Sequence, residues 1–172
     1  MDGHCDGRCC FGGGSIFIYA EDILRFMKYF NVELKEFIEK YTKIEKTYCG
    51  STEHRSLIPV VTIKEKERGA CIFLSDEGTC SVHDNHPIQC KLYPFWDLFC
   101  SSEKDWQKLQ KKCPGIDEKL VHDEEYFYPP EKIEELVALD KKNEEDWEKA
   151  MIKWDDDYIG FLKDYMKKKG MT

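Results

Sequence analysis

Two stretches near the N-terminus carry hydrophobic residues every three or four positions, which is the spacing of one face of a helix. In residues 21–30 these positions are Ile23, Leu24, Phe26, Met27 and Phe30, and in residues 34–41 they are Leu34, Phe37, Ile38 and Tyr41. Acidic residues at the start of the first stretch suit the positive end of a helix dipole, and we expect Asn31 to cap the second. The pattern therefore predicts two consecutive amphipathic helices.

Shorter apolar stretches have the character of β-strands. Residues 57–63 are rich in Val and Ile, and residues 15–19 form a second short apolar run. Residues 71–74 and 80–83 flank an Asp-Glu-Gly turn, so we predict a β-hairpin there. Each arm of this hairpin would carry one cysteine.

Capping and turn residues predict two further short helices. Asn85-His86-Pro87 can begin the first, with proline at an early position, and Tyr93-Pro94 should end it. Ser102 with Asp105 resembles the capped start of the second, which we expect to reach Lys112.

The C-terminal third contains no cysteine, and its hydrophobic residues again recur at helical spacing. They are Trp147, Met151, Trp154, Tyr158, Phe161, Leu162 and Tyr165. We predict an α+β fold that is mainly α-helical, with a small cysteine-bearing β-hairpin or sheet packed against helices. Residues 4–116 would form the cysteine-bearing domain, and residues 117–172 an amphipathic helical extension packed on it.

Charge and hydropathy narrow the classes of partner and location. The net charge is -8, and an acidic surface repels phosphate backbones, so no nucleic-acid partner is expected. An acidic surface suits solubility or docking to a basic protein partner. No apolar run approaches the roughly 18 residues that span a bilayer, and no secretory signal precedes the first cysteine. We therefore expect a cytoplasmic protein without membrane contact.

The chain has nine cysteines, and in a reducing compartment clustered cysteines more often bind metal or do redox chemistry than form disulfides. Thiolates bind zinc and iron in clusters strongly. Neighbouring side chains such as Cys9 and Cys10 share a site only where the backbone turns, and the glycines on either side supply that freedom. The spacing matches neither a zinc ribbon nor a ferredoxin, so spacing alone leaves the metal open.

Several motifs, in order, resemble those of the CxxCxxCC family of zinc- or iron-chelating domains, the YkgJ-like cysteine-cluster proteins. The resemblance covers roughly residues 4 to 116. It is carried by Cys5-Asp6-Gly7-Arg8-Cys9-Cys10, Glu21-Asp22-Ile23, Cys71-Ile72-Phe73-Leu74, Asp76-Glu77-Gly78-Thr79-Cys80-Ser81-Val82-His83, Pro87-Ile88-Gln89-Cys90-Lys91-Leu92-Tyr93-Pro94-Phe95 and Cys113-Pro114-Gly115.

This resemblance implies a metal-chelating domain with a set of thiolate ligands. The cofactor-binding candidates that it implies are Cys9, Cys10, Cys71, Cys80, Cys90 and Cys113, with Cys5 as a further metal ligand. The chain departs from the family in having one cysteine before the pair, and in carrying His86 where the family often has Arg. That exchange removes a guanidinium or adds an imidazole ligand. We interpret Cys49 and Cys100 as core residues, and His83 and His86 as hydrogen-bonding neighbours of the site.

We predict a metal-binding protein that holds an iron–sulfur cluster through cysteine thiolates. The alternative is a structural zinc-binding protein. A lower alternative is a protein-modifying enzyme related to flagellin lysine methylases, which the resemblance alone suggests, and a disulfide-bonded secreted protein ranks last. The sequence assigns no catalytic residue.

Overall fold

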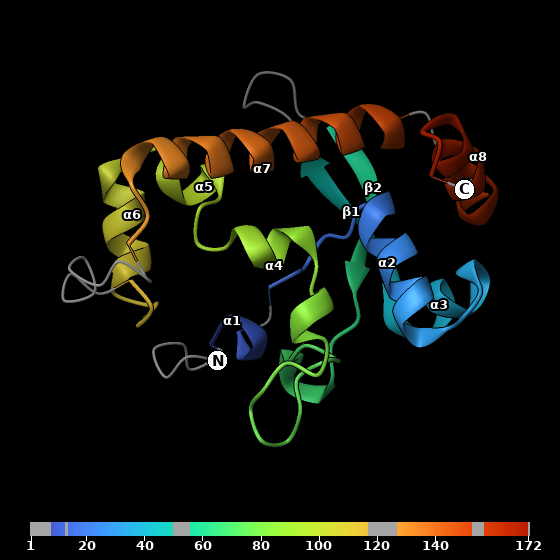
Figure 1. Cartoon of the computed structure of the whole chain (residues 1–172), viewed down its shortest axis with the longest axis horizontal. Coiled ribbons are helices and arrows are strands. Elements are labelled where there is room, and N and C mark those ends of the chain that lie inside the picture. Colours follow the sequence, from blue (N-terminus) through green and yellow to red (C-terminus); the bar gives the residue numbers. More distant parts are fainter. Residues whose placement is uncertain (1–7, 13, 50–55, 117–126, 153–156, 172) are drawn as a thin grey trace.

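The computed structural model describes residues 8–12, 14–49, 56–116, 127–152 and 157–171. Helices dominate these residues, and one two-stranded antiparallel sheet accompanies them, so the mainly α-helical α+β fold class is confirmed (Figure 1). In chain order the elements, including two 3₁₀ helices named η1 and η2, are α1 (Arg8–Phe11), α2 (Ala20–Phe30), α3 (Leu34–Tyr41), β1 (Thr42–Cys49), β2 (Ser56–Ile63), η1 (Glu67–Gly69), η2 (His83–Asn85), α4 (Ile88–Leu92), α5 (Asp97–Cys100), α6 (Glu103–Gln110), α7 (Pro130–Met151) and α8 (Tyr158–Lys168).

The two predicted N-terminal helices are confirmed as α2 and α3, but Asn31 has a different role from the predicted one. It ends α2 in the left-handed conformation, with φ 52°, and Glu33 takes the N-cap position of α3. Asparagine tolerates this conformation better than most residues other than glycine. The residue therefore closes the first helix and does not cap the second.

The sheet pairs β1 with β2, and the predicted strand at residues 57–63 is confirmed. Residues 15–19 run along β2 with one bridge, Phe17 to Thr62, and are otherwise not a strand. Two backbone hydrogen bonds hold them there, from Ile18 N to Val61 O at 3.0 Å and from Ile63 N to Ile16 O at 2.9 Å. This attachment places the chain that follows the cysteine pair against the sheet.

The predicted hairpin at residues 71–74 and 80–83 is wrong in detail, because neither arm is a strand. A single bridge joins Leu74 to Cys80. The Leu74 N–H donates to the Cys71 carbonyl at 3.0 Å, which bends the first arm into a turn. Local bonds thus use backbone groups that a strand ladder would need, and the segment is a series of tight turns.

The short helices begin and end close to the predicted residues. α4 starts after Pro87 and ends at Leu92, with Tyr93 as its C-cap. α6 starts after Ser102, whose hydroxyl accepts a hydrogen bond from the Asp105 N–H at 3.2 Å. The start of α6 confirms the capping signal at Ser102, whereas Pro87 is the N-cap residue of α4 and no side-chain cap bond forms there.

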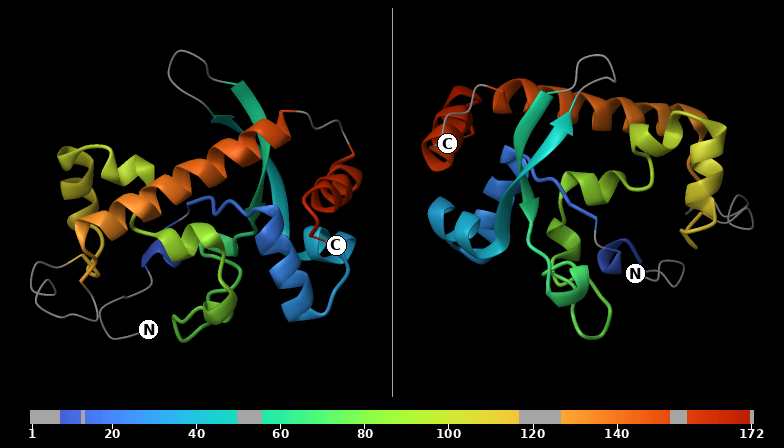
Figure 2. Two further views of the ribbon diagram at one scale, coloured as in Figure 1. Left: turned by 45° about the horizontal axis from the view of Figure 1, so that its top comes forward. Right: turned by 180° about the vertical axis from the view of Figure 1, so that it is seen from behind.

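Helix α7 runs along most of the molecule, with α5 and α6 near one end and α8 at the other (Figures 1 and 2). It contacts α4, α5 and β2. Side chains of α7 and α8 join the hydrophobic core formed by α2, α3 and the sheet; they are Trp147, Met151, Tyr158, Leu162 and Met166. Trp154 lies outside the described residues. The division into a domain and an extension stays a prediction, although the core is shared.

None of the helices in the described ranges is long and apolar enough to cross a membrane.

Candidate metal centre

Five cysteines from separate stretches of the chain line one pocket, which we call the thiol pocket. Its volume is about 240 Å³. Its walls are Cys9, Cys10, Ile16, Ile63, Cys71, Phe73, Cys80, Val82, His83, His86, Pro87, Cys90, Tyr93 and Trp96. The structure therefore brings together five of the seven cysteines named as ligand candidates, and surrounds them with apolar side chains.

Backbone contacts hold the cysteine-bearing segments against one another. The Cys71 N–H donates to the Cys10 carbonyl at 2.8 Å, which joins α1 to the turns that follow β2. Cys71 also bridges to Glu65, and Cys80 bridges to Leu74. These contacts bring the cysteine pair in α1 beside two cysteines that lie more than sixty residues later in the chain.

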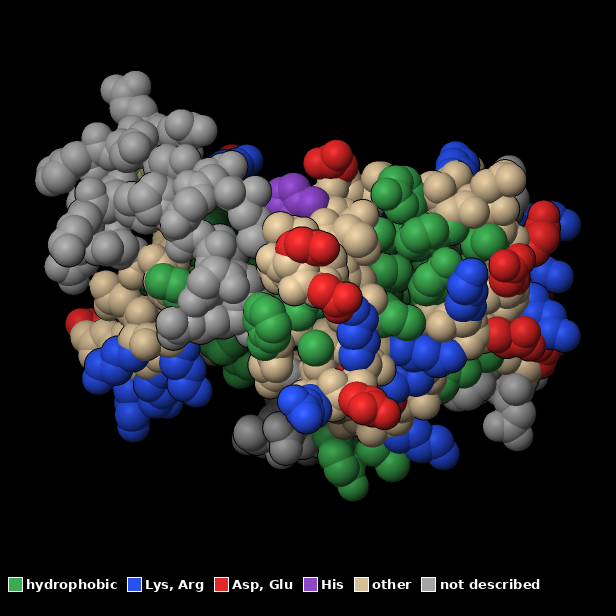
Figure 3. Space-filling model, turned by 90° about the horizontal axis from the view of Figure 1, so that it is seen from below, with side chains coloured by type: hydrophobic (Ala, Val, Ile, Leu, Met, Phe, Trp, Pro, Cys, Tyr) green, Lys and Arg blue, Asp and Glu red, His purple; other side chains and the backbone are tan. Residues whose placement is uncertain are grey.

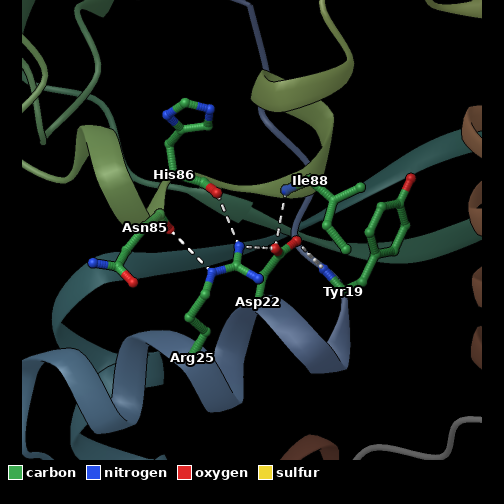
Figure 4. Close-up of polar contacts among 6 residues, drawn as sticks. All are labelled: Tyr19, Asp22, Arg25, Asn85, His86 and Ile88. Atoms are coloured by element: carbon green, nitrogen blue, oxygen red, sulfur yellow. Dashed lines mark hydrogen bonds and ion pairs between the residues drawn. The ribbon is translucent and has the colours of Figure 1, made fainter. Parts of the chain in front are cut away.

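The segment before Cys90 is held by an ion pair on α2 whose carboxylate is buried and whose arginine is half-buried (Figure 4). Asp22 is fully buried and accepts hydrogen bonds from the backbone N–H of Ile88 at 3.0 Å and of Tyr19 at 3.2 Å. Arg25 contacts the Asp22 carboxylate at 2.5 Å and donates to the carbonyls of Asn85, at 3.3 Å, and His86, at 2.9 Å. We call these two residues the α2 ion pair; it attaches α2 to the chain on which His86 and Cys90 lie.

Gln89 holds the same segment from another direction. Its side-chain oxygen accepts a hydrogen bond from the Phe17 N–H at 2.6 Å, and its carbonyl accepts one from the indole N–H of Trp96 at 2.8 Å. Sequence reasoning missed both Arg25 and Gln89. The spacing of Arg25 three residues after Asp22 signalled an ion pair, but no sequence signal indicated the partner of Gln89.

The thiols of the pocket lie in surroundings that favour the protonated form. A hydrogen bond with Cys9, burial and the neighbouring cysteines raise the pKa of Cys10. Burial is the largest cause that raises the pKa of Cys71, Cys80 and Cys90, and nearby cysteines add to it. Thiolates crowded in this way repel one another, and a cation between them would reverse the balance. The donor set therefore fits a bound metal.

Two histidines line the thiol pocket beside the cysteines. The rings of His83 and His86 lie 5.1 Å apart between centroids. Burial and the charge of His83 lower the pKa of His86, which favours the neutral imidazole, the form that binds metals. Both histidines therefore lie beside the cysteines of the thiol pocket.

The remaining cysteines are not gathered here. Cys5 and the side chain of Cys49 lie outside the described residues. Cys100, in α5, and Cys113, after α6, are half-buried and are not among the residues that line the thiol pocket. The ligand role of Cys5 and Cys113 stays a prediction.

The thiol pocket is not closed around a single ion. In the described part of the chain, no three or more His, Cys, Asp or Glu side chains are arranged to hold one metal ion. The seven described cysteines are all free of disulfide bonds. The five thiols thus share one pocket without forming a preassembled single-ion site among the described residues.

Comparison of the sequence with protein families indicates a function for this arrangement of thiols. The model of the CxxCxxCC family, described as "Putative zinc- or iron-chelating domain", matches residues 2–114. The chain belongs to the CxxCxxCC family. The match includes all nine cysteines and α2 with its ion pair, whereas α7 and α8 follow it. Metal binding, of zinc or iron, is the activity that the CxxCxxCC description gives. No solved structure matches the chain.

Proposed function

We propose that this CxxCxxCC protein holds an iron–sulfur cluster in the thiol pocket, with ligands drawn from Cys9, Cys10, Cys71, Cys80 and Cys90. The observation that carries the proposal is that five thiols from three separate stretches of chain line a single pocket. Iron–sulfur clusters are held chiefly by cysteine thiolates, and five candidates exceed the four that one cluster requires.

The size and walls of the pocket support a cluster over a single ion. A volume of about 240 Å³ is several times that of one water molecule, which is about 30 Å³ in the liquid. Ile16, Ile63, Phe73 and Val82 provide apolar walls. A hydrophobic shell restricts water and tunes the potential of a metal centre, which suits a redox-active cluster.

Structural zinc binding is the second candidate, and the two histidines favour it. Mixed cysteine and histidine ligation is typical of zinc, and both His83 and His86 line the pocket. In that case the metal would tie α1, the turns at residues 71–83 and α4 together.

A matched pair of variants tests the proposal. The protein is purified without oxygen and reconstituted with iron and sulfide, and visible absorption, iron and acid-labile sulfide are measured. We expect Cys90→Ser to lose most of the thiolate-to-iron absorption, because serine is a harder and poorer ligand for iron. Cys100→Ser is the control, because Cys100 is half-buried but does not line the pocket.

The outcomes separate the two candidates. A colourless protein that contains stoichiometric zinc would favour the structural zinc site and contradict the iron–sulfur cluster. Retention of a full cluster by both Cys90→Ser and Cys80→Ser would remove these residues as ligands. A protein that binds neither metal would refute both candidates.

A further inference from the structure

A second and larger cavity, of about 750 Å³, lies beside the thiol pocket. We call it the α6 cleft. It is lined by Cys9, Tyr93, Leu98, Phe99, Ser101, Asp105, Lys108, Leu109, Lys111 and Lys112. Cys9 and Tyr93 line both cavities, and Cys9 is exposed, whereas the other described cysteines are half-buried. The cleft is thus an approach from solvent to the Cys9 side of the thiol pocket.

The α6 cleft is basic in a protein that is otherwise acidic. The chain has a net charge of -8, yet three lysines and one aspartate are the charged residues that line the cleft in the part of the chain that the structure describes. Asp105 forms an ion pair with Lys108 at 2.6 Å, so Lys111 and Lys112 give the described part of the lining a net positive charge. Figure 3 shows basic side chains gathered at the end of the molecule where α6 lies. A basic cleft attracts anions, the more so where its walls have a low dielectric.

Apolar side chains supply the rest of the walls. The rings of Tyr93 and Phe99 meet edge-on, with centroids 6.1 Å apart, and Trp96 stacks on Phe99 at 5.3 Å. Trp96 also lines the thiol pocket, so these three rings connect the two cavities. Leu98, which also lines the cleft, is 70% exposed and adds apolar surface that is open to solvent. Such walls fit an apolar, planar group.

We propose that the α6 cleft binds a small organic anion, a carboxylate or a phosphate ester with a planar apolar group, next to the metal centre. The lysines bind the anionic group and the Tyr93–Phe99 wall packs against the apolar group. The volume lies within the range of small-molecule sites, roughly 300 to 1,000 Å³. The position of the ligand next to a metal rests on the proposed function, whereas the presence of an anion site does not.

The anion site is tested with benzoate and phenyl phosphate as probes and neutral benzamide as their control. Ligand-observed NMR titration of the full chain, with and without reconstituted metal, measures the dissociation constants. We expect at least one of the two anions to bind at least tenfold more tightly than benzamide, and its binding to weaken as salt is raised, because salt screens exposed charges. Binding of phenyl phosphate alone would assign the phosphate ester, and binding of benzoate alone the carboxylate.

Variants locate the site. Changing Lys108, Lys111 and Lys112 together to Gln should weaken anion binding at least tenfold. Changing Lys163, Lys167 and Lys168 to Gln is the matched control, because these three exposed lysines lie on α8, and it should change binding less than twofold. Equal binding of benzamide and of both anions, or equal loss in both triple variants, would overturn the proposal. Circular dichroism verifies that each variant is folded.

The link to the metal has its own readout. Saturating anion should change the visible spectrum of the reconstituted centre in the wild type, and not in the α6 triple variant. An anion that binds without changing the spectrum would overturn the position beside the metal. A chain that takes up no metal would refute the proposed function, whereas the titration without metal would still decide whether the cleft binds anions.

Discussion

At the residue scale, Asp22 of the α2 ion pair contributes to the placement of the candidate ligands. Asp22 is fully buried, accepts hydrogen bonds from two backbone N–H groups and forms an ion pair with Arg25. Burial raises the pKa of Asp22, and the hydrogen bonds and Arg25 oppose that effect. The sequence suggested only a favourable charge at the start of a helix. The distance of more than sixty residues to Ile88 hid the contact that connects α2 to the Cys90 segment.

We expect Asp22→Asn to lower the free energy of unfolding by about 1 to 3 kcal/mol, because a neutral amide replaces the buried carboxylate that accepts hydrogen bonds from Arg25 and from two backbone N–H groups. The same change should weaken metal binding, since it alters the acceptor of the Ile88 N–H and removes the carboxylate that positions Arg25 against the Asn85 and His86 carbonyls. Denaturant unfolding of the metal-free protein and metal titration measure the two effects.

Glu21→Gln provides the control, because Glu21 is exposed on the same helical turn. It should change the free energy of unfolding by less than about 0.5 kcal/mol. If Asp22→Asn and Glu21→Gln had equal effects, the α2 ion pair would not hold the segment as we describe.

At the scale of the elements, a carboxylate on α7 contacts the start of α5, close to a second carboxylate. The buried side chain of Asp140, on α7, accepts a hydrogen bond from the Asp97 N–H at the start of α5. Glu144 lies one turn further along α7, and its partial burial and the charges of Asp140, Asp97 and Glu148 raise its pKa to about 7. Sequence periodicity identified the apolar face of α7 but did not show that its acidic residues would face another acidic residue.

This arrangement predicts a pH-dependent contribution to stability. A carboxyl group whose pKa is higher in the folded state destabilises the fold once the unfolded chain has lost its proton. Relative to Glu144→Gln, the wild type should therefore lose stability as pH rises from about 4.5 to about 7, and the difference should be constant above that. Because more than a third of Glu144 is exposed, screening keeps the gain in Glu144→Gln below about 1 kcal/mol.

Denaturant unfolding at pH 4.5 and pH 8 measures this effect. Glu134→Gln, an exposed position on the same helix, should give no such pH-dependent gain. A gain for Glu144→Gln that is as large at pH 4.5 as at pH 8 would contradict the raised pKa.

The element predictions failed where turns decided the structure. Residues 71–74 have an apolar strand-like composition, yet a bond from Leu74 N to the Cys71 carbonyl makes a turn. The sequence pattern records polarity and not the competition between local and cross-strand hydrogen bonds. Asn31 failed as a predicted cap for a different reason: its left-handed conformation, with φ 52°, closes the preceding helix.

At the scale of the whole molecule, one core joins the family-matched residues to the helices that follow them. Leu162, on α8, is fully buried in the core that also contains Phe26 and Val61. Residues after position 114 lie outside the CxxCxxCC match. We therefore expect the stability of the thiol pocket to depend on residues outside the family match.

We expect Leu162→Ala to lower the free energy of unfolding by about 2 to 5 kcal/mol, because it removes buried methyl groups and leaves a cavity. Since the core is shared, unfolding should remain a single transition when followed by tryptophan fluorescence and by circular dichroism. Lys163→Ala, at an exposed neighbouring position, should change little. Two separate transitions would show that α8 is not part of the same cooperative unit.

The sequence by itself determined the amphipathic helices, the strand at residues 57–63, the family and the thiol chemistry, because periodicity and motif spacing are local properties of the chain. Only the tertiary structure decided which thiols share a pocket. It placed Cys71, Cys80 and Cys90 beside the Cys9–Cys10 pair, and left Cys113 outside that pocket. Contacts between segments far apart in sequence, such as Asp22 with Ile88, form only when the chain folds. The local sequence of one segment does not indicate which distant segment it will contact.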